Sequence, residues 1–410
     1  MAMFDGVQFV LVHRARPVRR SRMASVSASS ASVRHASVFI ELDRWRIVLA
    51  LAVVAMHAQA LGFLPWAEAG WTGRLAHDAV VGFFVVSGYS VMQAASGAGW
   101  QPHAFLVGRW SRLYSLVVPA LLLTLCLDAL GRTLRPDLYP LWMYAKWPLH
   151  LGFHGLFLGE TWTHSYAAFS NVPYWSLGYE AWYYLLLAAW LMPPRLRALC
   201  IALVLVCMGP RVLLLLPCWW MGATAWRWVE QGRLPAWLGR LIAPQSLLGP
   251  SVLLLGLYAI WTASPWAQSS RVATESLSLQ IAAHWGPEMR LSYSRWFVAD
   301  WITAAVFAGV ILMIAARPMA FRPITPSVTQ NQARARVQAT TRWLAFHSFG
   351  IYLLHYPLLL LAAAAGLAGR DAGTGLLIVL AVVSVCVGLS AACARTRPFW
   401  QRLLAWRLVR

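Results

Sequence analysis

Residues 374–394 read TGLLIVLAVVSVCVGLSAACA, a stretch without a single Asp, Glu, Lys or Arg. A helix needs roughly 20 apolar residues to cross the hydrocarbon core of a bilayer. Lipid offers the backbone no hydrogen-bond partners, so a stretch of this kind has to be helical there. The segment therefore predicts a membrane-spanning helix.

Comparable apolar runs recur through most of the chain, and charged residues fall between them. Their lengths and flanking charges predict an all-α, polytopic membrane protein with about ten transmembrane helices. The run at 147–159 is too short to cross and is interpreted as re-entrant or interfacial. The predicted spans are residues 39–61, 79–95, 113–130, 175–192, 198–215, 216–229, 247–263, 296–316, 343–364 and 374–394.

The composition excludes a soluble globular protein. The chain of 410 residues is 60% hydrophobic and only 12% charged, and its mean hydropathy is +0.58. Soluble domains keep about a quarter of their residues charged. A chain this poor in charge cannot cover a globule of this size with charged side chains, so much of its surface has to face lipid.

The net charge of +20 does not indicate nucleic-acid binding. The arginines lie between apolar runs, and they form no basic stripe interleaved with aromatic residues. Basic residues in short loops mark the cytoplasmic side of a membrane protein. Alternate loops of this chain are rich in arginine, which predicts that both termini are cytoplasmic.

The same pattern divides the chain into three regions. Residues 1–38 are rich in Arg and Ser and predict a disordered, basic cytoplasmic tail. Residues 39–395 form the transmembrane domain, and residues 396–410 form a second basic cytoplasmic tail. The six cysteines lie in apolar stretches without a Cys-x-x-Cys pair, so the sequence predicts neither a disulfide framework nor a bound metal.

Ionisable side chains inside apolar spans are functional candidates, because placing them in lipid costs free energy. The first span holds Arg46 and His57, which a helix places on one face about 16 Å apart. Arg46, near the cytoplasmic end, suits the phosphates of a nucleotide-like donor. His57 can act as a general base or as a nucleophile that carries an acyl group. Alternatively, Arg46 anchors the interface by snorkelling and His57 hydrogen-bonds a neighbouring helix.

Three further ionisable residues each have more than one interpretation. Asp43 either orients Arg46 or caps the start of its helix. Glu180 orients His57, pairs with an arginine, or is an interfacial carboxylate. His355, in the turn before a proline, either lines a cavity or bonds the carbonyl groups that the proline frees.

Two short elements have both packing and chemical interpretations. Ser87 and Gly88 permit close helix packing, and without a G-x-S-x-G sequence packing is favoured over a nucleophilic Ser87. Arg109 and Arg112 are spaced i to i+3, on one helical face before the third span. They either grip the phosphates of a donor or anchor the helix on its positive, cytoplasmic side.

Five of these elements, taken in order, resemble the acyltransferase-3 family of integral membrane O-acyltransferases. Each element alone is weak, but their order along the chain is fairly specific. The matching residues are Asp43, Arg46 and His57; Phe83, Phe84, Ser87 and Gly88; Arg109 and Arg112; Trp175, Ser176, Leu177 and Glu180; and Ser348, Gly350, Ile351, Tyr352, Leu353, His355 and Pro357.

The resemblance implies an enzyme that moves an acyl group from acyl-CoA, usually acetyl-CoA, to a hydroxyl group of a glycan or cell-surface polysaccharide. It implies about ten helices in a bacterial inner (plasma) membrane, with acyl-CoA, the acceptor and membrane lipid as partners. It also implies that Arg46 and His57 are essential.

On this interpretation the donor phosphates bind Arg46, Arg109 and Arg112, and the thioester reaches His57, which Glu180 orients. Two other hypotheses stay open. One is a transporter or flippase for a lipid-linked glycan, against which the lack of an internal repeat counts. The other is an inactive relative that acts as a scaffold, against which the presence of both Arg46 and His57 counts.

Overall fold

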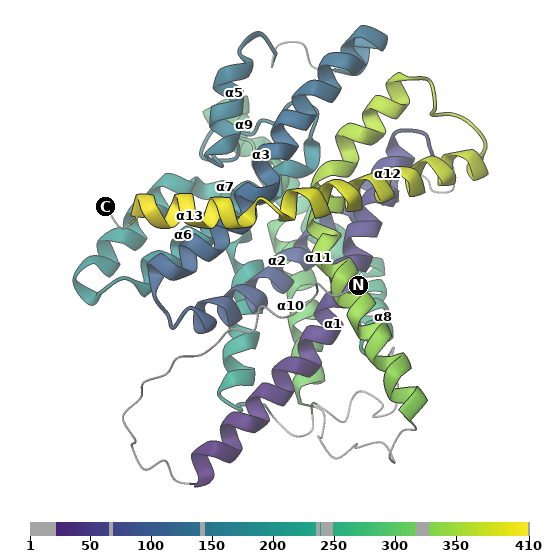
Figure 1. The fold of residues 1–410 in the computed structure, drawn as a ribbon. Coiled ribbons are helices and arrows are strands. Elements are labelled where there is room, and N and C mark those ends of the chain that lie inside the picture. The colour runs from purple at the N-terminus through teal and green to yellow at the C-terminus, as the bar shows by residue number, and fades with distance from the viewer. Residues whose placement is uncertain are drawn as a thin grey trace.

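The computed structural model describes most of the chain, and in this part the regular secondary structure is entirely helical (Figure 1). The predicted all-α fold class is therefore confirmed. The described residues are 22–64, 69–139, 144–234, 238, 249–316 and 328–408. The helices are α1 (Arg22–Ala60), α2 (Ala69–Gly97), α3 (Pro102–Leu134), α5 (Trp147–Gly155), α6 (Trp175–Leu191), α7 (Pro194–Glu230), α8 (Gly249–Ala263), α9 (Pro265–Trp285), α10 (Phe297–Ala315), α11 (Val328–Ala364), α12 (Ala372–Ala394) and α13 (Arg397–Leu408).

Six segments of the described helices are long and apolar enough to cross a membrane, which fits a multi-pass membrane protein. The six do not include α1, α6 or the short apolar helix α8, so the number of about ten spans and the side of each terminus stay predictions. The six segments are Arg74–Gly97, Pro102–Leu134, Pro194–Glu230, Phe297–Ala315, Ala335–Ala364 and Ala372–Ala394.

The boundary between two predicted spans is wrong. The sequence predicts spans at 198–215 and 216–229, but both lie on α7, where the helical geometry breaks at Gly209 instead. Gly209 has φ 75° and ψ 176°, a conformation that glycine adopts without steric cost. A Cβ atom there would lie 2.7 Å from the backbone nitrogen of Trp162, so the kink also needs glycine for space.

Part of the N-terminal tail, for which the sequence predicts disorder, is helical. Residues 1–21 lie outside the described part, but α1 already begins at Arg22, and Val38 is fully buried. The C-terminal tail forms α13, which packs on α3 and runs across the direction of α1 (Figure 1). There Trp400 stacks on Tyr114 with 5.5 Å between the ring centroids. Apolar contacts with the bundle explain why these basic segments are helical.

The centre of the bundle consists of α1, α2, α7, α10 and α11. Helix α2 packs against α7, α1 packs against α2 and α11, and α10 packs against α7. A Cβ atom at Gly88 would lie 2.0 Å from the carbonyl oxygen of Trp219, and one at Gly222 would lie 2.0 Å from that of Val85. The close packing expected at Gly88 is thus confirmed, and it brings α2 and α7 into backbone contact.

Candidate active site

The first cavity of the site, which we call the arginine cavity, gathers three predicted cations. Helix α1 contributes Arg46, and α3 contributes Arg109 and Arg112. The cavity has a volume of about 90 Å³. Its other polar lining residues are Ser87, Ser90, Ser176, Glu180, Tyr184, Ser348 and Tyr352.

Arg46 is fixed by two hydrogen bonds from its guanidinium group. Nη1 donates to Oδ1 of Asp43 over 2.6 Å, and Nη2 donates to the hydroxyl oxygen of Ser90. Asp43 lies well inside α1, so it orients Arg46 and does not cap a helix start. Arg109 lies over the ring of Tyr184, with 5.9 Å between its guanidinium carbon and the ring centroid.

Glu180 belongs to the arginine cavity, so the expectation that it orients His57 is not met. Its Oε1 atom accepts hydrogen bonds from the hydroxyl of Ser87 over 2.5 Å and from the hydroxyl of Tyr184. The structure thus places Ser87 as a hydrogen-bond donor to Glu180. Spacing along one helix could not reveal which neighbouring helix the carboxylate would meet.

The second cavity, the histidine cavity, is larger, with a volume of about 510 Å³. It contains His57 from α1 and His77 from α2, beside flat aromatic rings. The remaining lining residues include Gln59, Val172, Pro173, Trp175, Tyr293, Arg295 and Trp296.

The hydrogen bonds around His57 define which of its ring nitrogens is available. Nδ1 of His355 lies 3.0 Å from the carbonyl oxygen of Ile351 and must donate to it, because a carbonyl only accepts. In a neutral His355, Nε2 then accepts, and the atom 2.8 Å away is Nδ1 of His57. Nδ1 of His57 therefore carries the proton, and its Nε2 has a free lone pair for a general base or a nucleophile.

His355 is fully buried and supports His57 instead of lining the cavity itself. The proline two residues later, Pro357, cannot bond the carbonyl oxygen of Leu353. That oxygen accepts a hydrogen bond of 2.9 Å from Nδ2 of Asn171, so the freed carbonyl is satisfied by a different residue than the sequence suggested.

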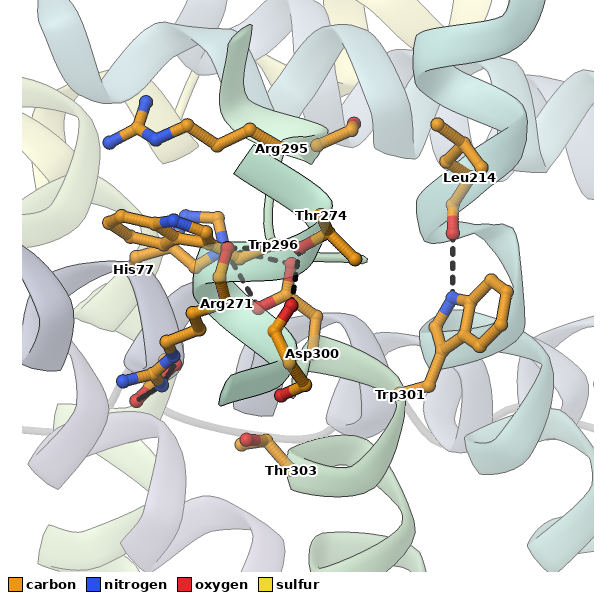
Figure 2. Close-up of polar contacts among 12 residues, drawn as sticks. His77, Leu214, Arg271, Thr274, Arg295, Trp296, Asp300, Trp301 and Thr303 are labelled. Atoms are coloured by element: carbon orange, nitrogen blue, oxygen red, sulfur yellow. Dashed lines mark hydrogen bonds and ion pairs between the residues drawn. The ribbon is translucent and has the colours of Figure 1, made fainter. Parts of the chain in front are cut away.

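A second histidine in this cavity was missed by sequence reasoning. Nε2 of His77 lies 3.1 Å from both carboxylate oxygens of Asp300, in the first turn of α10 (Figure 2). Asp300 is 0% exposed. A carboxylate inside the predicted span 296–316 was itself a usable signal, because such a group needs a partner. Its partner could not be read from the sequence, since it lies on a helix more than two hundred positions away.

The two cavities meet at Val80 of α2 and Tyr352 of α11, which line both. The Tyr352 hydroxyl lies 2.8 Å from the hydroxyl of Ser176 and donates over 2.8 Å to the carbonyl oxygen of Pro173. Helix α1 contributes Arg46 to one cavity and His57 to the other. The site is therefore elongated, with cations at one end and imidazoles at the other.

Comparison with known proteins identifies the family of the chain. A family model described as an acyltransferase domain, that of the acyltransferase-3 family, matches residues 39–395. None of the curated proteins or solved structures compared with the chain matches it. Because the family match covers most of the sequence and includes both cavities, this protein belongs to the acyltransferase-3 family and is a membrane acyltransferase.

Proposed function

We propose that the protein is an O-acyltransferase that binds acyl-CoA, most simply acetyl-CoA, in the arginine cavity and acylates a glycan hydroxyl in the histidine cavity. The observation that carries this proposal is the junction of the two cavities at Val80 and Tyr352. Acyl-CoA is elongated, with phosphates at one end and a thioester at the other. It fits a site with arginines at one end and histidines at the other.

The donor end is supported by charge. Arg46, Arg109 and Arg112 exceed in number the nearby carboxylates, which are Asp43 and Glu180. Guanidinium groups bind phosphate oxygens through pairs of parallel hydrogen bonds. The cavity, with a volume of about 90 Å³, is small for a whole nucleotide, so the bulk of the donor would extend out of it on the side that we propose to be cytoplasmic.

The acceptor end is supported by its aromatic walls. Trp175, Tyr293 and Trp296 line the histidine cavity together with Arg295. Flat aromatic rings pack against the apolar faces of sugar rings, and a few polar groups then fix the orientation of the ligand. A glycan hydroxyl is the acceptor that this mixture favours.

The chemistry centres on His57. Nε2 of this ring has a free lone pair, because Nδ1 carries the proton and donates it to His355. It can take the acyl group from the thioester, or it can accept the proton of the acceptor hydroxyl. The proposed cytoplasmic location of Arg46 would place His57 toward the opposite side of a bacterial inner membrane.

The proposal is tested by acyl transfer in membrane vesicles. Radiolabelled acetyl-CoA is supplied on the cytoplasmic side, and label in the glycan fraction is compared between wild type and His57→Ala. We expect label that depends on His57. The experiment is repeated with acyl-CoA donors of several chain lengths. If folded wild-type protein transfers label to the glycan fraction from none of them, transport of a lipid-linked glycan is favoured.

A further inference from the structure

The histidine cavity contains two imidazoles with different partners. His57 is bonded to another imidazole, that of His355, over 2.8 Å. His77 is bonded instead to the carboxylate of Asp300, with Nε2 3.1 Å from each oxygen. Both contacts with Asp300 use Nε2 of His77. Because a carboxylate only accepts, this Nε2 carries the proton, and Nδ1 of His77 has the lone pair.

The neighbouring charges make Asp300 the carboxylate of His77 alone. Asp78 is adjacent in sequence, but both its oxygens accept hydrogen bonds from Nη2 of Arg271, over 3.0 and 2.8 Å. The hydroxyl of Tyr258 donates to Asp78 over 2.8 Å as well. Two separate pairs result, Asp78 with Arg271 and Asp300 with His77.

The ring of His77 is also held in place by aromatic contacts. It stacks on Trp175, with 5.9 Å between the centroids and 7° between the planes. Trp296 meets it edge-on, with 5.4 Å between the centroids. Both tryptophans line the histidine cavity, so an acceptor bound against them would lie beside His77.

We propose that His77, oriented by Asp300, is the general base that deprotonates the acceptor hydroxyl, which leaves His57 to act on the acyl group. This inference rests on the proposed function. A carboxylate on one ring nitrogen fixes the tautomer and stabilises the imidazolium that forms when the other nitrogen takes a proton. An imidazole partner offers no negative charge for that purpose, so His57 is the weaker candidate for the base.

The step balances as follows. The acceptor oxygen forms a bond to the acyl carbonyl carbon, and the bond from that carbon to its leaving atom breaks. The leaving atom is the thioester sulfur, or Nε2 of His57 where the acyl group has first moved there. The proton passes from the acceptor hydroxyl to Nδ1 of His77 and ends on the CoA sulfur, which leaves as the thiol, so both histidines return to their neutral forms.

The test compares the purified enzyme with His77→Ala and Asp300→Asn, using acetyl-CoA and a glycan acceptor that wild type acylates. We expect His77→Ala to lower kcat about 10²- to 10⁴-fold, with less than about threefold change in CoA affinity. Added imidazole should restore part of the activity of His77→Ala, because a free base can occupy the vacated space. Asp300→Asn should lower kcat with no rescue by imidazole, since its histidine is still present.

Tyr258→Phe is the matched control, because it removes a hydrogen bond from the neighbouring Asp78 pair and leaves His77 and Asp300 intact. Its kcat should equal that of wild type. The base role is overturned if His77→Ala keeps a kcat within threefold of wild type, or if a folded His77→Ala loses activity that imidazole does not restore. Failure of wild type to acylate any acceptor would instead refute the proposed function itself.

Discussion

The arginine cavity and the histidine cavity share lining from α1, α2, α6 and α11 but hold their polar groups in different ways. In the arginine cavity, Arg46 bonds Asp43 from its own helix, and Glu180 bonds hydroxyl groups. In the histidine cavity, each histidine bonds a residue on another helix that is remote in sequence. His57 bonds His355, and His77 bonds Asp300. One cavity thus keeps its cations partly available, and the other fixes the tautomers of two imidazoles.

This difference teaches how one site can separate binding from chemistry. Phosphate binding needs cations and tolerates flexible side chains, whereas proton transfer needs a ring nitrogen held within hydrogen-bond reach. We therefore expect substitutions in the arginine cavity to change donor affinity and substitutions in the histidine cavity to change the rate of transfer.

The largest effect is expected at the histidine end. His57→Ala should lower acyl transfer about 10³-fold or more, since the ring that acts on the acyl group would be lost. Its affinity for CoA should stay within about threefold of wild type. Rates of labelled transfer and CoA titrations on the same preparation measure both quantities. His284→Ala, at an exposed position on α9, is the control, and equal transfer by the two variants would contradict the assignment.

At the arginine end, Arg46→Ala should weaken CoA binding about 10- to 100-fold, the equivalent of roughly 1.5–3 kcal/mol for hydrogen bonds to a charged group. The substitution also leaves Asp43 without its cation. Isothermal titration with CoA measures the change. Arg195→Ala removes an exposed arginine at the start of α7 and should bind CoA normally. An Arg46 variant that binds CoA normally but cannot transfer would place Arg46 in the chemistry instead.

The junction between the cavities can be narrowed. Val80 is 4% exposed and lines both cavities, so Val80→Phe should hinder passage of the thioester. We expect transfer to fall about 10-fold, an effect on the order of 1.4 kcal/mol, while CoA still binds. Val48→Phe, at a position on α1 that is 58% exposed, adds the same ring outside the site. Unchanged transfer by a folded Val80→Phe would argue that the donor does not pass this point.

The smallest effect concerns stability outside both cavities. Glu160, in the segment between α5 and η2 (Val172–Tyr174), is buried. Its Oε2 atom accepts a hydrogen bond of 2.9 Å from Ser165, and Oε1 has no hydrogen-bond partner among the described residues. Burial raises the pKa of this carboxyl from 4.5 to about 8.

Between these two pKa values the folded protein keeps a proton that the unfolded chain releases, so stability falls as the pH rises from 4.5 to 8. Glu160→Gln cannot ionise and should therefore raise the unfolding temperature at pH 9 by a few degrees, at about 2–4 °C per kcal/mol. At pH 5 the gain should be much smaller. Thermal unfolding in detergent at both pH values measures this, and an equal shift at the two would contradict the pKa assignment.

Much of the site could be predicted because an ionisable side chain in a membrane span costs free energy, so each one in an apolar run indicates a functional or paired group. Arg46 and His57 stand out in an apolar span, and their spacing correctly places them along one helix. What failed was pairing between helices. Glu180 meets Ser87 and Tyr184 and not His57, and His77 was overlooked because its carboxylate, on α10, is remote in sequence. Periodicity describes one helix at a time and does not report which helices become neighbours.

The fold shows the same division. Apolar runs predict helices well, because backbone hydrogen bonding in lipid leaves no alternative. The break in α7 was placed wrongly because the predicted boundary followed hydropathy, although the Gly209-Pro210 pair is a helix-breaking signal at the kink. The helical part of the N-terminal tail, residues 22–38, was predicted to be disordered because its composition is basic and rich in serine, although it begins α1.

The central claim, that donor and acceptor enter one path from opposite ends, is tested most directly with vesicles of known orientation. Labelled acetyl-CoA, which does not cross the bilayer, is supplied to inside-out or right-side-out vesicles that contain the protein and a glycan acceptor on both faces. We predict that transfer occurs only when the donor is on the face of Arg46, and that labelled glycan appears on the opposite face. Labelled glycan on the same face as the donor, whichever face that is, would contradict the account.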